Sequence, residues 1–131
     1  MYLLDTDTCI AILRGNAKVI ARRRAVYQPV FTSEITASEL FYGAAKSEDP
    51  TANRQVVLAF LRTLEVVPIS LAGAQLFGGF KALLQRSGTL IPDADLWIAS
   101  IARALRAKVV TGNTKHLGRV PGLECEDWIR G

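Results

Sequence analysis

The sequence has few of the residues that form thiolate metal sites or disulfide scaffolds. Its 131 residues include two cysteines, Cys9 and Cys125, which lie near opposite ends of the chain, and one histidine. Neither cysteine has a second cysteine or a histidine at ligand spacing, which argues against a zinc site and against a disulfide-stabilised fold. We therefore expect both cysteines to be buried and reduced.

Long apolar segments are also absent. The longest strongly apolar run, VVLAFL, is far too short to span a bilayer, and no basic segment followed by an apolar run opens the chain. Half of the residues are hydrophobic and 21% are charged, and no low-complexity tract or repeat occurs. We predict a single domain over residues 1–131, located in the cytoplasm and without a membrane partner.

The charge balance is mildly basic. Sixteen lysines and arginines against twelve acids give a net charge of +4, which favours polyanionic partners without identifying one. The positions of the charges are more informative: Arg14, Lys18 and Arg22 recur every four residues, and Arg23 and Arg24 extend that surface. Two explanations stay open for this stripe, a solvated helix face and contact with the phosphates of RNA.

Strand-like and helix-like segments alternate along the chain. Short apolar runs predict strands at residues 2–5, 29–33, 66–70, 108–113 and 123–128. Periodic apolar patterns predict helices at residues 8–14, 16–26, 34–46, 51–64 and 71–85, and a further helix after residue 92. This alternation indicates an α/β fold with a mainly parallel central sheet and helices on both faces.

Two acids follow the first predicted strand, in the segment LLDTDT. Asp5 stands at the carboxyl end of that strand, where open parallel sheets bind ligands, and Asp7 lies two residues further on. Either acid also suits the N-cap of the following helix. A ligand-binding role and a capping role are therefore both open for Asp5.

A third acid, Glu39, lies within the predicted helix at 34–46. Ile35 and Tyr42 place bulk on the same helix face, so we expect the Glu39 carboxylate to be only partly exposed. An isolated glutamate on a helix is usually an ordinary solvent-facing residue. A partly buried carboxylate needs a metal or a cation as a partner.

Further polar residues occur at the ends of later elements. Asp93 follows Pro92 and suits an N-cap, and Asp95 lies in the first turn of the same helix, over its buried side. Thr111 and Asn113 follow the apolar run of the fourth predicted strand and therefore reach the same sheet edge as the first strand. Each of these residues also has an ordinary structural explanation as a cap or a turn former.

Several carboxylates are thus expected at one edge of the sheet. Carboxylates that converge without a cation raise one another's pKa and destabilise the fold. Oxygen ligands from several elements are typical of sites for Mg²⁺ or Mn²⁺. Such an ion activates water and stabilises the charge on a phosphate during displacement, so the acids predict a metal-dependent nuclease.

Five short motifs resemble, in order, those of a known family. The segments LLDTDT, ITASELFYGA, IPDADLWIAS, VVTGNTKHL and GLECEDW are similar to the motifs of the PIN domain, in particular of the VapC toxins of toxin–antitoxin pairs. The resemblance implies a three-layer α/β PIN-like fold and a Mg²⁺- or Mn²⁺-dependent endoribonuclease. It also implies a VapB-like antitoxin partner and a homodimer, alone or within a larger toxin–antitoxin assembly.

The resemblance also implies roles for individual residues. Asp5, Glu39 and Asp95 match the metal-binding and catalytic acids of the family. Many relatives have Asn where this chain has Asp7, so Asp7 is either an additional ligand or a hydrogen-bonding residue. Many have Asp where this chain has Asn113, which favours one tightly held ion, with a second recruited by substrate, over a four-carboxylate scheme with two ions.

Two further expectations concern the surroundings of these acids. Two positions are open for His116, one facing the site and one as a surface or turn residue; the second is favoured over a catalytic base, because a bound metal already provides a nucleophile at neutral pH. Apolar side chains of two helices are expected to leave a groove for an amphipathic antitoxin segment: Ile10, Ile12, Leu13, Leu40, Phe41 and Tyr42.

Other functional classes are weighed against this interpretation. A PIN nuclease of RNA maturation or of structured DNA is one alternative, and a non-catalytic Mg²⁺-binding interaction module is another. A phosphoacceptor receiver domain is disfavoured because the strand at 66–70 carries no acid and Lys108 begins rather than ends its strand.

Overall fold

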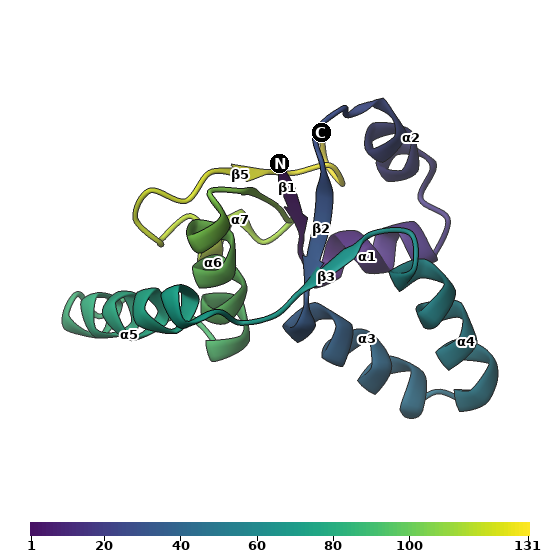
Figure 1. The fold of residues 1–131 in the computed structure, drawn as a ribbon, viewed down its shortest axis with the longest axis horizontal. Helices are drawn as coiled ribbons and strands as arrows, with labels where there is room; N and C mark the ends of the chain where they lie inside the picture. Colours follow the sequence, from purple (N-terminus) through teal and green to yellow (C-terminus); the bar gives the residue numbers. More distant parts are fainter.

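A five-stranded parallel sheet forms the centre of the protein, which the computed structural model describes over residues 1–131 (Figure 1). The strands are β1 (Tyr2–Leu4), β2 (Val30–Ser33), β3 (Glu65–Val67), β4 (Lys108–Val110) and β5 (Cys125–Glu126). They lie in the order β3-β2-β1-β4-β5, and every neighbouring pair is parallel. The predicted α/β class with a parallel central sheet is confirmed.

Helices cover both faces of this sheet. They are α1 (Thr6–Leu13), α2 (Ala17–Ala25), α3 (Glu34–Ala45), α4 (Pro50–Leu61), α5 (Leu71–Arg86), α6 (Asp93–Leu105) and α7 (Thr114–Leu117). Helices α5, α6 and α7 pack on one side of the sheet and α1 to α4 on the other, which gives three layers (Figure 1).

The two cores follow from the alternation of side chains along each strand. Leu3 of β1 belongs to the core beneath α5 and α6, whereas Tyr2 and Leu4 belong to the core beneath α1 to α4. In β4, Val109 and Val110 divide between the two cores in the same way. Successive side chains of a strand point to opposite faces, so a short run of apolar residues supplies both layers.

Several predicted boundaries shift for identifiable reasons. Helix α1 begins at Thr6, two residues earlier than expected, because Asp5 caps it, and Gly15 ends it at a φ of +78°. Strand β3 stops before Pro68 at an edge of the sheet, as that proline suggests. The last strand is reduced to two residues, and α7 is a single turn that no periodic pattern predicts.

The strand order brings two distant parts of the chain together at one edge. From β1 the chain continues to β2 and β3 on one side, and then crosses to β4 on the other. This reversal places the crevice between the carboxyl ends of β1 and β4, where ligands bind in open parallel sheets. Asp5 and Thr111 directly follow these two strands.

Two further observations concern membrane-spanning helices and the cysteines. No helix is both long enough and apolar enough to cross a membrane. Both cysteines are free thiols as expected, but only Cys9 is fully buried, whereas Cys125 is half-buried. Burial raises the pKa of the Cys9 thiol to about 12, so this residue is an unreactive part of the core.

Candidate active site

Asp5 lies between the ends of β1 and β4 and is only 5% exposed. Its Oδ1 accepts a hydrogen bond from the Thr6 amide at 2.8 Å, and its Oδ2 accepts one from the Thr111 hydroxyl at 2.7 Å. Asp5 is therefore the N-cap of α1 and also a strand-end carboxylate beside β4. The two interpretations that the sequence leaves open are compatible.

The surroundings of Asp5 disfavour its charged form. Burial is the main cause that raises the pKa of Asp5 to about 6; the hydrogen bond from Thr111 opposes this rise, and the negative charges of Asp7 and Asp95 add to it. Burial also raises the pKa of Asp7. The site therefore concentrates negative charge that a cation would stabilise.

Asp95 is held by residues that follow β4. Its Oδ2 accepts a hydrogen bond from Asn113 Nδ2 at 3.3 Å and lies 3.2 Å from His116 Nδ1. Asn113 Nδ2 and His116 Nδ1 are themselves 3.1 Å apart. His116 thus faces Asp95 from α7 with its side chain 34% exposed, which agrees with the position beside the site that the sequence leaves open for it.

Glu39 reaches the site through a threonine. The Thr6 hydroxyl donates to Glu39 Oε1 at 2.7 Å and lies 3.1 Å from the Thr36 hydroxyl. Glu39 is exposed rather than partly buried as expected, because Tyr42 is 66% exposed and does not cover it. Its carboxylate is thus adjacent to the start of α1 and open to solvent.

Asp7 and the C-terminal turn (residues 127–130) hold the peptide that follows Thr111. The Gly112 amide donates to Asp7 Oδ2 at 2.8 Å, and Arg130 Nη1 donates to the Gly112 carbonyl at 2.9 Å. Arg130 Nη1 also donates to Asp127 Oδ2 at 3.0 Å. We call this arrangement the Gly112 clamp. Sequence reasoning missed Arg130, since nothing in the pattern of residues around it signals a contact across the fold.

Asp93 does not belong to the site, and its predicted capping role is wrong. The N-cap of α6 is Pro92, which has no side-chain cap hydrogen bond, and Asp93 is the first helical residue. Its carboxylate is 60% exposed and forms an ion pair with Lys81 at 3.0 Å. Asp93 thus faces α5 and solvent, whereas Asp95 reaches the residues after β4.

The donors around Asp5 suit a hard divalent cation. No group of three carboxylate, histidine or cysteine side chains is arranged to hold an ion as the structure stands. The available ligands are nevertheless carboxylate and hydroxyl oxygens, which Mg²⁺ and Mn²⁺ prefer. No lysine or arginine forms an ion pair with Asp5, Asp7 or Asp95, and the one basic side chain paired with these acids is His116, at Asp95. The repulsion that Asp7 and Asp95 exert on the buried Asp5 therefore has no cationic side chain at Asp5 to offset it. A divalent cation would supply the missing positive charge and suits the oxygen ligands present.

Comparison with known proteins identifies the family. Residues 2–123 match the family model of the PIN domain. The tRNA(fMet)-specific endonuclease VapC of Salmonella typhimurium is 37% identical over 97% of both chains, and ribonuclease VapC2 of Haemophilus influenzae is 35% identical over 98% of both. The chain belongs to the PIN-domain family, among the VapC ribonucleases.

Solved structures of PIN-domain relatives agree with this assignment. DNA-bound VapBC from Salmonella typhimurium matches with a TM-score of 0.92 and 36% identity over 97% of both chains. VapBC2 from Rickettsia felis, bound to a promoter DNA fragment, matches with a TM-score of 0.91 and 30% identity over 97% of this chain and 98% of that chain. The expected PIN-like fold and the resemblance to VapC toxins are confirmed.

The basic residues of this PIN domain do not form the continuous stripe that their spacing suggests. Gly15 separates α1 from α2, so Arg14 lies at the end of one helix while Lys18 and Arg22 lie on the next. Lys18 Nζ donates to the Arg130 carbonyl at 2.9 Å, and Arg22 pairs with Glu126 at 3.5 Å. Both of these side chains are therefore tied to the C-terminal segment.

The other two arginines of α2 differ from each other. Arg23 donates to the carbonyl and hydroxyl of Thr63 at 2.9 and 3.0 Å and lies over the Phe60 ring, 5.8 Å from its centroid. Arg24 is exposed and forms no ion pair. Arg23 thus has contacts that support the fold. The binding of RNA by the five basic residues stays a prediction: Arg14, Lys18, Arg22, Arg23 and Arg24.

A groove runs between α1, α3 and α4 beside the site. It has a volume of about 610 Å³, and among the residues expected there it is lined by Ile10, Leu13, Leu40 and Tyr42, together with Val56 and Val57 of α4. Phe41 and Ile12, which are also expected there, do not line it. Thr6 and Glu39 belong to its wall, so the groove opens onto the acids.

Proposed function

We propose that this PIN domain is the endoribonuclease toxin of a VapBC-type toxin–antitoxin pair and that it works with bound Mg²⁺ or Mn²⁺. The observation that carries the proposal is the buried Asp5, whose charged form is disfavoured by burial and by Asp7 and Asp95 in the absence of any cationic partner. Burying a carboxylate in this way is costly unless a cation offsets it.

Asp5, Asp95 and Glu39 are the residues that would hold the ion. Bound there, it would supply a water activated for attack and would offset negative charge on the phosphate. Thr111 orients the Asp5 carboxylate, and Thr6 orients that of Glu39. Thr111 follows β4 and Thr6 begins α1, so these two carboxylates are oriented from different parts of the chain, while Asn113 donates to Asp95.

Asn113 and Asp7 take supporting roles in this proposal. Asn113 is neutral and its amide already donates to Asp95, which favours one tightly held ion over two. The Asp7 carboxylate accepts from Gly112 and, more weakly, from the Thr8 hydroxyl at 3.3 Å. Asp7 therefore acts by positioning the peptide after β4, and of the two roles left open for it the hydrogen-bonding one is better supported.

RNA is the proposed substrate class. Two of the relatives, from Shigella flexneri and Salmonella typhimurium, are tRNA(fMet)-specific endonucleases, so tRNA(fMet) is the first RNA to test. The net charge of +4 supports attraction of a polyanion, while the metal would allow a phosphate to approach the acids.

A small antitoxin is the proposed partner. The groove between α1, α3 and α4 is apolar on its floor and ends at Glu39 and Thr6, which suits an amphipathic segment that carries a basic side chain towards the acids. The solved relatives from Salmonella typhimurium and Rickettsia felis are VapBC complexes. A homodimer of the toxin within such an assembly is part of the same proposal.

Expression in bacteria tests the toxin proposal. Induction of the wild-type chain alone should arrest growth, whereas Asp95→Asn should be harmless at equal expression, because it removes a charge and keeps the shape of the side chain. Co-expression with the small protein encoded beside it should restore growth and yield a complex that co-purifies. Growth unaffected by the wild type, or no binding by that neighbour, would contradict the toxin role.

A further inference from the structure

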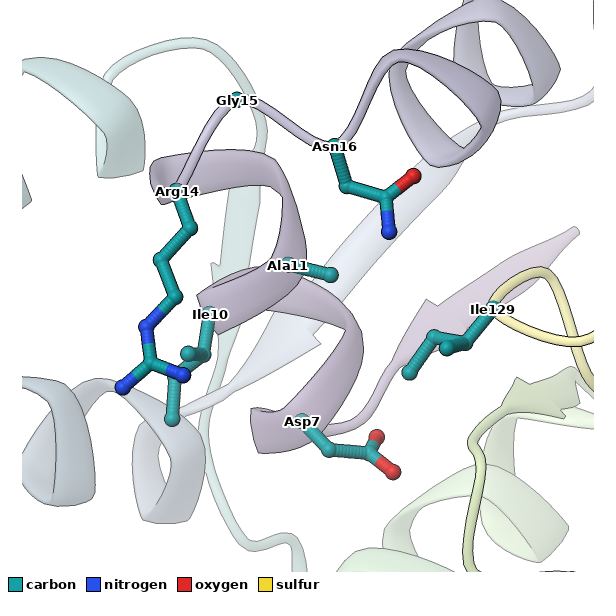
Figure 2. Close-up of a pocket in the computed structure, with 7 residues that line it drawn as sticks. All are labelled: Asp7, Ile10, Ala11, Arg14, Gly15, Asn16 and Ile129. Carbon is teal, nitrogen blue, oxygen red and sulfur yellow. The ribbon is translucent and has the colours of Figure 1, made fainter.

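A hollow of about 620 Å³ opens beside Asp7, between α1, the corner from α1 to α2, and the C-terminal turn (Figure 2). Its lining consists of Asp7, Ile10, Ala11, Arg14, Gly15, Asn16 and Ile129. Asp7 belongs to this hollow and also holds the Gly112 peptide next to the site. The hollow therefore continues the active site in a direction distinct from the antitoxin groove, although Arg14 and Ile10 border both.

The middle of the hollow is apolar. Figure 2 shows Ala11 at its centre, with Arg14 and Ile10 on one side and Ile129 on the other. Ala11 is small, so a flat ring can lie against the helix between the two isoleucines. Apolar walls of this kind accept the face of a nucleobase without selecting one base over another.

The polar groups at the rim are free to bind a ligand. Asn16 Oδ1 accepts from the Val19 amide at 3.2 Å as the N-cap of α2, which leaves both hydrogens on Nδ2 as donors. In Figure 2 this amide nitrogen is directed into the hollow. Arg14 is exposed and forms no ion pair within the chain, so its charge is available.

We propose that this hollow is a nucleotide subsite, which holds the nucleotide next to the cleaved bond of the RNA. The base lies between Ala11 and Ile129, Asn16 donates to its polar edge, and Arg14 contacts a phosphate. The inference rests on the proposed ribonuclease function.

Abasic substrates test the base contact directly. A bond that the wild type cuts in tRNA is first mapped, and short oligoribonucleotides spanning it are made intact or with one abasic residue on either side of the bond. In the wild type, loss of one of these two bases should lower kcat/KM about tenfold. In Asn16→Asp the intact substrate should already be cut about tenfold more slowly, and removal of the same base should have little further effect.

The variants are chosen to keep the fold. Aspartate and serine cap helices as well as asparagine, so Asn16→Asp and Asn16→Ser retain the N-cap of α2 and should melt with the wild type. Arg14→Gln should weaken binding of intact and abasic substrates alike, because it removes a phosphate contact. Arg54→Gln, an exposed arginine on α4 away from the hollow, is the matched control and should leave all constants unchanged.

Binding is measured separately from cleavage, so that this inference can be distinguished from the ribonuclease proposal. Kd values for the same oligoribonucleotides, measured in EDTA, should show the same loss of base dependence in Asn16→Asp. Base-dependent binding without cleavage by the wild type would contradict the ribonuclease proposal and support the subsite. Equal base dependence in wild type and Asn16→Asp, or variants impaired only in antitoxin binding, would overturn the subsite.

Discussion

At the scale of single residues, Asp5 has a pH-dependent energetic cost. Its pKa of about 6, against an ordinary 3.8, means that the metal-free folded state keeps a proton that the unfolded chain has lost. The stabilising contribution is complete below about pH 4 and is lost as the pH rises through about 6, on the order of 3 kcal/mol in all. Asp7, whose pKa is raised in the same direction, adds to the trend.

Calorimetry on wild type and Asp5→Asn isolates this contribution, because Asp7 is present in both proteins. Without metal, the Tm of the wild type should fall relative to that of Asp5→Asn between about pH 4 and pH 7. Mg²⁺ added near neutral pH should raise the Tm of the wild type and leave that of Asp5→Asn unchanged. If the Tm values of the two proteins changed in parallel with pH, the raised pKa of Asp5 would be contradicted.

Gly112 is a second residue with a specific requirement. A Cβ at this position would lie 2.8 Å from Asp7 Oδ2 and 3.0 Å from Arg130 Nη1. Both side chains can move, so Gly112→Ala should cost only about 1 kcal/mol of stability while it breaks the Gly112 clamp. We expect kcat to fall about tenfold with the metal affinity retained. A variant with full activity would show that the clamp does not position the site.

Residue-level prediction succeeds where a side chain directly follows a strand. Asp5, Thr111 and Asn113 meet as expected because parallel strands deliver their carboxyl ends to one edge. The contact of Arg130 could not be foreseen, and for His116 the sequence only leaves a position beside the site open. Arg130 and His116 reach the site through a C-terminal turn and a single helical turn, whose positions depend on tertiary packing rather than on any local pattern.

At the scale of elements, α5 shows how packing overrides weak local preference. The pair Gly78 and Gly79 lowers the helical propensity of its middle, yet the helix continues unbroken from Leu71 to Arg86. A Cβ built on either glycine meets no atom within 4 Å. Gly78→Ala should therefore stabilise the protein by about 0.5–1 kcal/mol in urea denaturation, without a change in activity. Destabilisation would mean that this face of α5 is covered in solution.

Helix α2 provides a test of which arginines are structural. Arg23→Ala should destabilise the protein by about 1–2 kcal/mol, because it removes two hydrogen bonds to Thr63 and the contact with Phe60. Arg24→Ala should change stability by less than about 0.5 kcal/mol and reduce the salt dependence of RNA binding by about one unit of slope. Equal effects of the two substitutions on stability would contradict this division.

The helices and strands also show how much of the fold could be predicted from the sequence. Apolar runs such as YLLD predict the strands because a buried parallel strand is apolar on both faces, and their alternation with helices predicts a parallel sheet. The order of the strands could not be predicted in this way and comes from the structure. Lengths are less predictable: β5 pairs over only Cys125 and Glu126, since the chain then turns into residues 127–130. Capping also shifts boundaries, as Asp5 does for α1.

At the scale of the whole molecule, the three regions proposed to bind metal, antitoxin and nucleotide lie at one edge of the sheet. The acids lie where β1 and β4 end, the apolar groove opens on one side beside Glu39, and the hollow opens beside Asp7. The overall charge of +4 attracts a polyanion, whereas the acids repel it until a cation is present. Substrate binding and metal binding are therefore expected to be coupled.

Cleavage of tRNA by the purified protein, with analysis of the product ends, tests the metal-dependent ribonuclease proposal most directly. With Mg²⁺ or Mn²⁺ the wild type should release products with 5′-phosphate and 3′-hydroxyl ends, because water rather than the 2′-hydroxyl is the nucleophile. EDTA should abolish cleavage, and Asp5→Asn should lower it by about a hundredfold or more while the protein stays folded. Cleavage that persists in EDTA, cyclic phosphate ends, or full activity in Asp5→Asn would contradict the proposal.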